Sequence, residues 1–141
     1  MGKRRKSREF ALQALYQRNI TREDALRILG QLRAHLLSEG EGDEFGEQIV
    51  IGVLEHCSQI DQLIEQYSEH WRLDRMSMID RTILRIATFE LLYRDDIPAK
   101  VTLNEAIDLG KRFGSTDSGS FINGILDRIQ REIAPKADAS H

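Results

Sequence analysis

Apolar residues recur every three or four positions along nearly the whole chain, and this spacing limits the possible folds more than any other feature. Such a period places the apolar side chains on one face of a helix. Residues 49–51 alone could form a buried strand, but the stripe continues on both sides of them without a turn signal. We therefore predict one long helix through this region, with its stripe at Phe45, Ile49, Gly52, Val53, His56, Ile60, Leu63 and Tyr67.

The remaining segments also carry helix signals. A first helix through residues 10–18 can reach back into residues 4–8, and a second is capped by Thr21 and ends at Gly40 and Gly42. Ser77 can cap a helix that ends at residues 94–96. A capping-box pattern at residues 102–105 predicts the start of another helix, and we expect the last helix at residues 121–133. Residues 114–120 predict a loop, because all seven are small or turn-forming.

These signals together predict an all-α protein, a compact single-domain bundle of six or seven helices. We expect a basic N-terminal arm at residues 1–9 leading into the first helix, a helical domain at 10–134, and a disordered tail at 135–141, after Pro135. Glu90 lies on the apolar stripe of its helix. We expect it to pair with an arginine such as Arg94, four residues further on.

Composition excludes several classes of protein. A chain of 141 residues with 40% hydrophobic residues can form one core without disulfides, and Cys57 has no second cysteine to pair with. The chain contains no apolar run of about 18 residues and no apolar leader, so we expect a cytoplasmic protein without membrane association. The net charge of −3 conceals an asymmetry, because the first eight residues carry +5 and the other 133 carry −8.

No pattern in the sequence predicts catalysis or metal binding. The single cysteine lies within an apolar stripe, where a packed thiol is the simpler interpretation. The carboxylates at residues 95–96 precede Pro98 and fit a solvated turn, and the glycines near residue 114 lack the order of a phosphate loop. We expect no enzyme activity, no cofactor and no metal, since the histidines are scattered at His35, His56, His70 and His141.

The basic arm indicates an anionic partner, although five cations in six positions could also be a solubilising tail. Two aromatic residues favour RNA. Tyr16 lies two helical turns beyond Arg8, and Phe121 follows the small-residue loop at the start of the last helix. Cations that hold phosphates and rings that stack on unpaired bases are what single-stranded nucleic acid requires. The alternative for Phe121 is an ordinary core position.

Four segments, in order, resemble the NusB family of antitermination factors. They are residues 4–16, which include Arg4-Arg5-Lys6-Ser7-Arg8, the central helix from Asp80-Arg81-Thr82 to Glu90-Leu91, Ile97-Pro98 with residues 101–106, and Phe113-Gly114 through Asp117, Phe121, Asn123-Gly124 and Leu126-Asp127. Together they span essentially the whole predicted domain.

The resemblance implies a non-enzymatic, all-helical transcription antitermination factor. Its partners would be a single-stranded boxA-type RNA of ribosomal RNA leader transcripts, the small-subunit ribosomal protein NusE, and the elongating RNA polymerase with other Nus factors; a homodimer is also possible. Asp80 would belong to the NusE-facing surface. The RNA-binding residues implied by the motif match are Arg4, Arg5, Arg8, Tyr16, Tyr67, Asp117, Ser118 and Phe121.

Two other interpretations remain open from the sequence. NusB-like domains also occur at the front of ribosomal RNA cytosine methyltransferases, which need a further Rossmann-type domain and a catalytic cysteine. A helical dimerisation or scaffold module would use the arm for solubility alone. Binding of boxA RNA, with and without NusE, distinguishes these interpretations.

Overall fold

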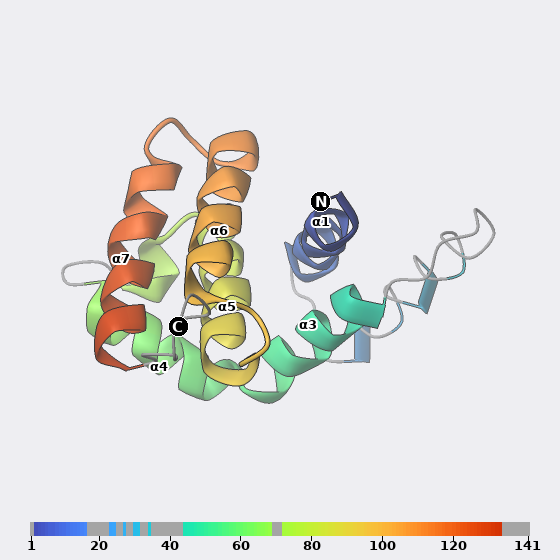
Figure 1. Ribbon diagram of the computed structural model, residues 1–141. Helices are drawn as coiled ribbons and strands as arrows, with labels where there is room; N and C mark the ends of the chain where they lie inside the picture. The colour runs from blue at the N-terminus through green and yellow to red at the C-terminus, as the bar shows by residue number, and fades with distance from the viewer. Residues whose placement is uncertain are drawn as a thin grey trace.

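The computed structural model describes residues 2–16, 23, 24, 27, 30, 31, 34, 44–68 and 72–133. For residues 2 and 3 it describes the backbone alone. The described part is helical and contains no strand. None of its helices is long and apolar enough to cross a membrane. Figure 1 shows the order of its elements: α1 (Gly2–Tyr16), α3 (Glu44–Glu55), α4 (Cys57–Tyr67), the 3-10 turn η1 (Leu73–Arg75), α5 (Met78–Tyr93), α6 (Ala99–Phe113) and α7 (Ser118–Glu132).

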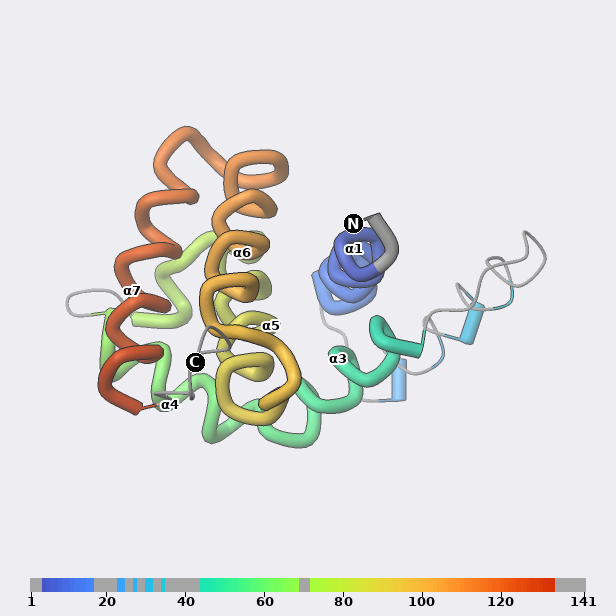
Figure 2. The backbone as a smooth tube through the Cα atoms, viewed as in Figure 1, coloured from blue at the N-terminus to red at the C-terminus, as the bar shows by residue number. Residues whose placement is uncertain are grey.

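Helix α5 is the centre of the bundle. It contacts α1, α3, α4, α6 and α7, and its side chains from Thr82 to Leu84 and from Ile86 to Leu91 are buried. In Figure 2, α6 and α7 lie side by side in front of α5, whereas α1 lies on the other side of α6 and rests on α3. The core is built mainly of isoleucine, leucine and alanine from all these helices. This arrangement confirms the predicted all-α class.

The basic arm is part of the first helix, because α1 already begins at Gly2. The predicted helix from Thr21 to Gly40 lies mostly outside the described residues, of which 23, 24, 27, 30, 31 and 34 are helical. The predicted tail at 135–141 also lies outside them. Ser77 caps α5 as expected, since its hydroxyl accepts a hydrogen bond of 3.1 Å from the backbone N–H of Asp80.

Two predicted helix boundaries were wrong. The predicted long helix is in fact two helices, α3 and α4, which are separated at His56, where φ is −115° and ψ is 20°. The stripe stays in register across this break, so periodicity alone does not reveal it. The capping-box pattern at residues 102–105 lies inside α6, which starts earlier, at Ala99, with Pro98 as its N-cap. Proline suits a helix start because no backbone N–H is needed there.

Glycines let the helices approach each other closely at two places. A Cβ built at Gly52 of α3 would lie 2.1 Å from a ring carbon of Phe89 on α5. A Cβ at Gly110 of α6 would lie 2.8 Å from Ile122 of α7. A methyl group at position 52 would overlap the Phe89 ring, whereas one at position 110 would require the end of the Ile122 side chain to move.

Gly52→Ala is expected to destabilise the protein by about 1–3 kcal/mol, because the added methyl overlaps the Phe89 ring and the packed core cannot yield without strain. Urea denaturation followed by circular dichroism measures the change. The variant Gly52→Ala/Phe89→Leu should recover part of the loss. Native stability in the single variant would show that α3 and α5 are not packed as described.

Candidate nucleic-acid interface

Arg8 and Glu90 form a buried ion pair between α1 and α5. Arg8 Nε lies 2.7 Å from Glu90 Oε2, and Arg8 Nη2 lies 2.8 Å from Glu90 Oε1. Their side chains are 4% and 1% exposed. Thr102 of α6 donates its hydroxyl to Glu90 Oε1 at 2.8 Å, so three helices meet at this carboxylate. The partner of Glu90 is an arginine, as expected, but it comes from α1 rather than from Arg94.

Two further arginines of α1, Arg5 and Arg4, also face acidic groups. Arg5 makes a two-point contact with Glu105 of α6, at 3.1 and 3.0 Å. Arg4 is half exposed, lies 3.5 Å from Asp96, and stacks its guanidinium over the Phe45 ring at 4.4 Å. Lys6 is exposed and makes no ion pair with any residue in the described part of the chain. Much of the positive charge of the arm is thus balanced inside the protein.

These contacts shift the titration of two carboxyl groups. The hydrogen bond from Arg94 lowers the pKa of Asp96 from 3.8 to about 2, and the charge of Arg4 acts in the same direction. The hydrogen bond from Arg5 lowers the pKa of Glu105. Both carboxylates therefore favour their charged forms in the folded protein.

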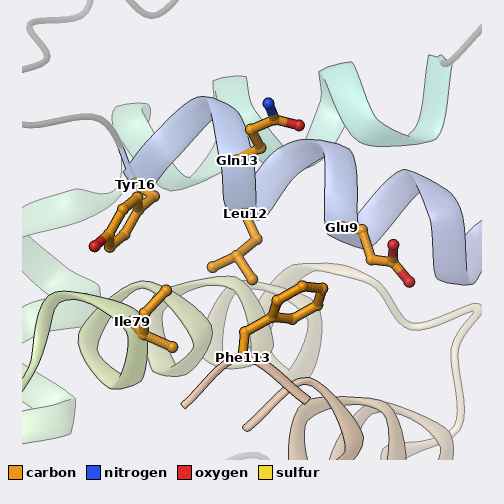
Figure 3. A pocket seen from close by; sticks show the side chains of 6 residues that line it. All are labelled: Glu9, Leu12, Gln13, Tyr16, Ile79 and Phe113. Carbon is orange, nitrogen blue, oxygen red and sulfur yellow. The ribbon is translucent and has the colours of Figure 1, made fainter.

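Tyr16 lies at the other end of α1, beside an apolar groove of about 370 Å³. Figure 3 shows Leu12 and Tyr16 of α1 facing Ile79, at the start of α5, and Phe113, at the end of α6. Tyr16 and Phe113 are 43% and 44% exposed. Two aromatic rings therefore line one hollow. The sequence predicts Tyr16 as an RNA-binding residue but does not point to Phe113.

The predicted loop is shorter than expected, because α7 already begins at Ser118. Ser118 is buried, and its hydroxyl accepts a hydrogen bond of 2.9 Å from the backbone N–H of Ser115. A Cβ at Gly114 would lie 2.3 Å from this hydroxyl oxygen, so glycine allows the tight turn. Ser118 thus shapes the turn, whereas Asp117 is exposed at its tip.

Phe121 is partly buried and packs against the core, yet it also borders two hollows of about 300 Å³ each. One hollow brings it together with Tyr67 and Arg128. The other brings it together with Asp80 and Asp117. Both interpretations of Phe121 made from the sequence are therefore correct in part.

Tyr67 and Asp80 are less accessible than their predicted roles suggest. Tyr67 is 7% exposed, and the guanidinium of Arg128 lies 5.4 Å from its ring centroid. Asp80 is 9% exposed, and its Oδ1 is buried without a hydrogen-bond partner among the described residues. Both residues nevertheless line hollows that Phe121 borders.

The predicted residues fall into two groups at opposite ends of α1. Arg4 lies beside Asp96 in the α5–α6 connection and Arg5 beside Glu105 of α6, whereas Tyr16 lies beside the start of α5. Twelve residues of helix separate Arg4 from Tyr16, which corresponds to about 18 Å. The hollow that Phe121 shares with Asp80 and Asp117 lies at the same end as Tyr16, because it includes residues that flank the start of α5. The cations and the rings therefore form two separate patches.

Nothing in the described part of the chain provides a metal site or a reactive thiol. No group of three potential ligands is close enough to hold a metal ion there. Burial raises the pKa of the Cys57 thiol, and the charge of Asp61 raises it further. Cys57 lies 3.6 Å from Asp61, which is bound by Arg85, so the thiol belongs to a structural contact between α4 and α5.

Comparison with known proteins gives a consistent result. The sequence profile of the NusB family matches residues 5–131. The transcription antitermination protein NusB of Myxococcus xanthus is 48% identical over 133 residues, which cover 92% of this chain and 95% of that protein. The NusB of Bacillus subtilis is 45% identical over 131 residues, covering 93% and 97%.

Solved structures share the fold. NusB of T. maritima superposes with a TM-score of 0.80 at 41% identity, covering 94% of this chain and 93% of that one. A crystal structure of NusB and NusE in complex with double-stranded RNA gives a TM-score of 0.75 at 23% identity, covering 93% and 98%. The fold and the helix contacts thus define a small all-helical bundle protein. The chain belongs to the NusB family of transcription antitermination proteins.

Arg8→Ala and Glu90→Ala are each expected to cost about 3–5 kcal/mol of unfolding free energy, because each removes the two-point partner of a charge that stays buried. The double variant should lose much less than the sum of the two single losses. Urea denaturation measures all three. Arg131→Ala, which removes an exposed pair with Asp127, is the control and should cost under about 1 kcal/mol. A loss that small for Arg8→Ala would contradict the buried pair.

Stability is expected to fall as the pH drops from about 4 towards about 2, because protonation of Asp96 removes its contact with Arg94. A carboxyl with a lowered pKa contributes stability above its unfolded pKa and loses it as the pH falls through its folded pKa. Asp96→Asn should show a smaller decrease in melting temperature over this interval, whereas Asp95→Asn should behave like the native protein. Identical curves for Asp96→Asn and the native protein would exclude this role.

Proposed function

We propose that the protein is a transcription antitermination factor that binds single-stranded boxA-type RNA of ribosomal RNA leaders together with NusE. It would then join the elongating RNA polymerase with other Nus factors, in the cytoplasm. The observation that carries the proposal is the family match over residues 5–131, with relatives near 45% identity over most of the chain. The protein would act by binding alone.

The exposed surface supports a division of roles among the predicted RNA residues and the neighbouring Lys6. Arg4 and Lys6 can approach phosphates directly, and Arg5 is partly exposed beside them. Tyr16, Asp117 and Phe121 line the hollows at the other end of α1. In this proposal Arg8, Tyr67 and Ser118 hold these groups in place from inside the protein, because their side chains are buried.

The geometry also favours a protein partner. The cation patch and the aromatic hollows are separated along α1, and the body of the chain is acidic, so this protein alone offers RNA a short and interrupted surface. A second protein that carries positive charge could bridge the two patches. The related structure that contains NusB, NusE and RNA supports NusE in this role. Asp80 and the groove between Tyr16 and Phe113 would face it.

A titration of fluorescein-labelled boxA RNA with the native protein, alone and with purified NusE, tests the proposal. We expect measurable binding by the chain alone and tighter binding with NusE present. Binding in neither condition would contradict the proposal and favour a scaffold role. An RNA of the same length with a scrambled sequence is the control.

The double variant Arg4→Ala/Lys6→Ala is expected to weaken RNA binding and to flatten its salt dependence. Each phosphate contact on a single strand contributes about −0.7 to the slope of log affinity against log salt, so losing two contacts should reduce the slope by about 1.4. Fluorescence anisotropy over a series of potassium chloride concentrations measures it. Arg131→Ala should leave the slope unchanged, since Arg131 lies near the end of α7. An unchanged slope in the double variant would remove the arm from the RNA site.

A further inference from the structure

Phe45 lies at the start of α3, and three guanidiniums lie over its ring. The guanidinium carbon of Arg4 is 4.4 Å from the ring centroid, that of Arg94 is 5.0 Å and that of Arg8 is 5.3 Å. All three are within the distance of about 6 Å at which a ring face attracts a cation. Two of these arginines belong to α1, which packs against α3 (Figure 1). An aromatic residue of α3 therefore contacts the basic arm directly.

The three arginines differ in how firmly other groups hold them. Arg8 and Arg94 each bind a carboxylate through two contacts of 2.7–2.9 Å. Arg4 lies 3.5 Å from Asp96, and both side chains are about half exposed. An exposed ion pair of this kind contributes little to holding a long side chain in one place. The Phe45 ring is therefore the main support of the Arg4 guanidinium in the described part of the chain.

We propose that Phe45 is a positioning residue for RNA binding, whose ring holds the Arg4 guanidinium at the surface in an orientation that meets a phosphate. The inference rests on the proposed function and deepens it by explaining how Arg4 acts. A guanidinium carries its five N–H donors in its own plane, whereas the ring attracts it through the ring face. The ring thus restricts Arg4 without occupying the donors that bind a phosphate. A firmly bound carboxylate would occupy those donors.

Lys6 provides a comparison on the same helix. It is exposed like Arg4, but it contacts neither a ring nor a carboxylate among the residues that the structure describes. Lys6 therefore reaches a phosphate as a mobile point charge, and it pays the full cost of ordering its side chain on binding. If the ring of Phe45 acts through Arg4, its removal matters only while Arg4 is present and is independent of Lys6.

A purely structural role is the alternative, because Phe45 is partly buried and packs against the core. Two substitutions separate the alternatives. Phe45→Leu keeps an apolar side chain in this place and removes the aromatic ring. Phe45→Tyr keeps the ring, so it should restore whatever depends on the attraction between the ring face and the cation.

Phe45→Leu is expected to raise the dissociation constant for boxA RNA about two- to fivefold, because fewer molecules hold Arg4 in the binding orientation. In an Arg4→Ala background the same change should have less than about a 1.5-fold effect, whereas in a Lys6→Ala background it should have its full effect. Phe45→Tyr should stay within about 1.5-fold of native. Phe10→Leu removes another partly buried ring that packs against the core, and it should do the same. Fluorescence anisotropy measures all these affinities.

Circular dichroism and thermal unfolding establish first that each variant is folded. Equal effects of Phe45→Leu with and without Arg4 would overturn the inference, because the ring would then act through the fold as a whole. Native affinity in a folded Phe45→Leu protein would also overturn it. An equal loss in Phe10→Leu would have the same meaning.

The Arg4 side chain of the free protein offers a test that needs no RNA. Nitrogen-15 relaxation should show an ordered Arg4 Nε in the native protein and in Phe45→Tyr, and a mobile one in Phe45→Leu. Arg4→Lys removes this signal and so assigns it. Unchanged order in Phe45→Leu would overturn the inference and leave the proposed function intact. Failure of the native chain to bind RNA, alone or with NusE, would instead contradict the proposed function, whatever the order of Arg4.

Discussion

The position of α1 depends on one buried contact, the two-point ion pair between Arg8 and Glu90. A charge removed from water is costly unless a partner compensates it, so neither residue can stay in the core alone. Thr102 adds a hydrogen bond to the same carboxylate and connects α6 to the pair. The register of α1 against α5 and α6 follows from this point. That register places Arg4 near Asp96 at one end and Tyr16 near Ile79 at the other.

The same contact divides the basic arm into an inner and an outer part. Arg8 stabilises the fold, Arg5 binds Glu105 at the surface, and Arg4 and Lys6 stay largely accessible. An arm of charge +5 therefore offers RNA much less than its full charge. The acidic body of the chain contributes directly to the fold, since three of its carboxylates bind cations of α1. In the proposed function, this balance limits the RNA footprint and leaves a role for a second protein.

Periodicity predicted the helical class because every stripe had the same spacing, and Ser77 gave a correct helix start. The break at His56 was hidden, since a kink that keeps the stripe in register leaves no trace in the pattern. Glu90 on an apolar face signalled a buried partner, but the choice between Arg8 and Arg94 needs tertiary structure. Burial of Tyr67 and Ser118, and the role of Arg128, also depend on contacts between distant segments.

The central claim is that Arg8 holds α1 in place without touching RNA. The most direct test replaces the buried polar cluster by apolar residues of similar size, in the variant Arg8→Met/Glu90→Leu/Thr102→Val. Such replacements can preserve or raise stability. We predict a folded protein with the native affinity for boxA RNA and the native salt dependence. A folded variant whose affinity falls tenfold, with a salt slope flattened by about 0.7, would show that Arg8 contacts a phosphate and would contradict the account.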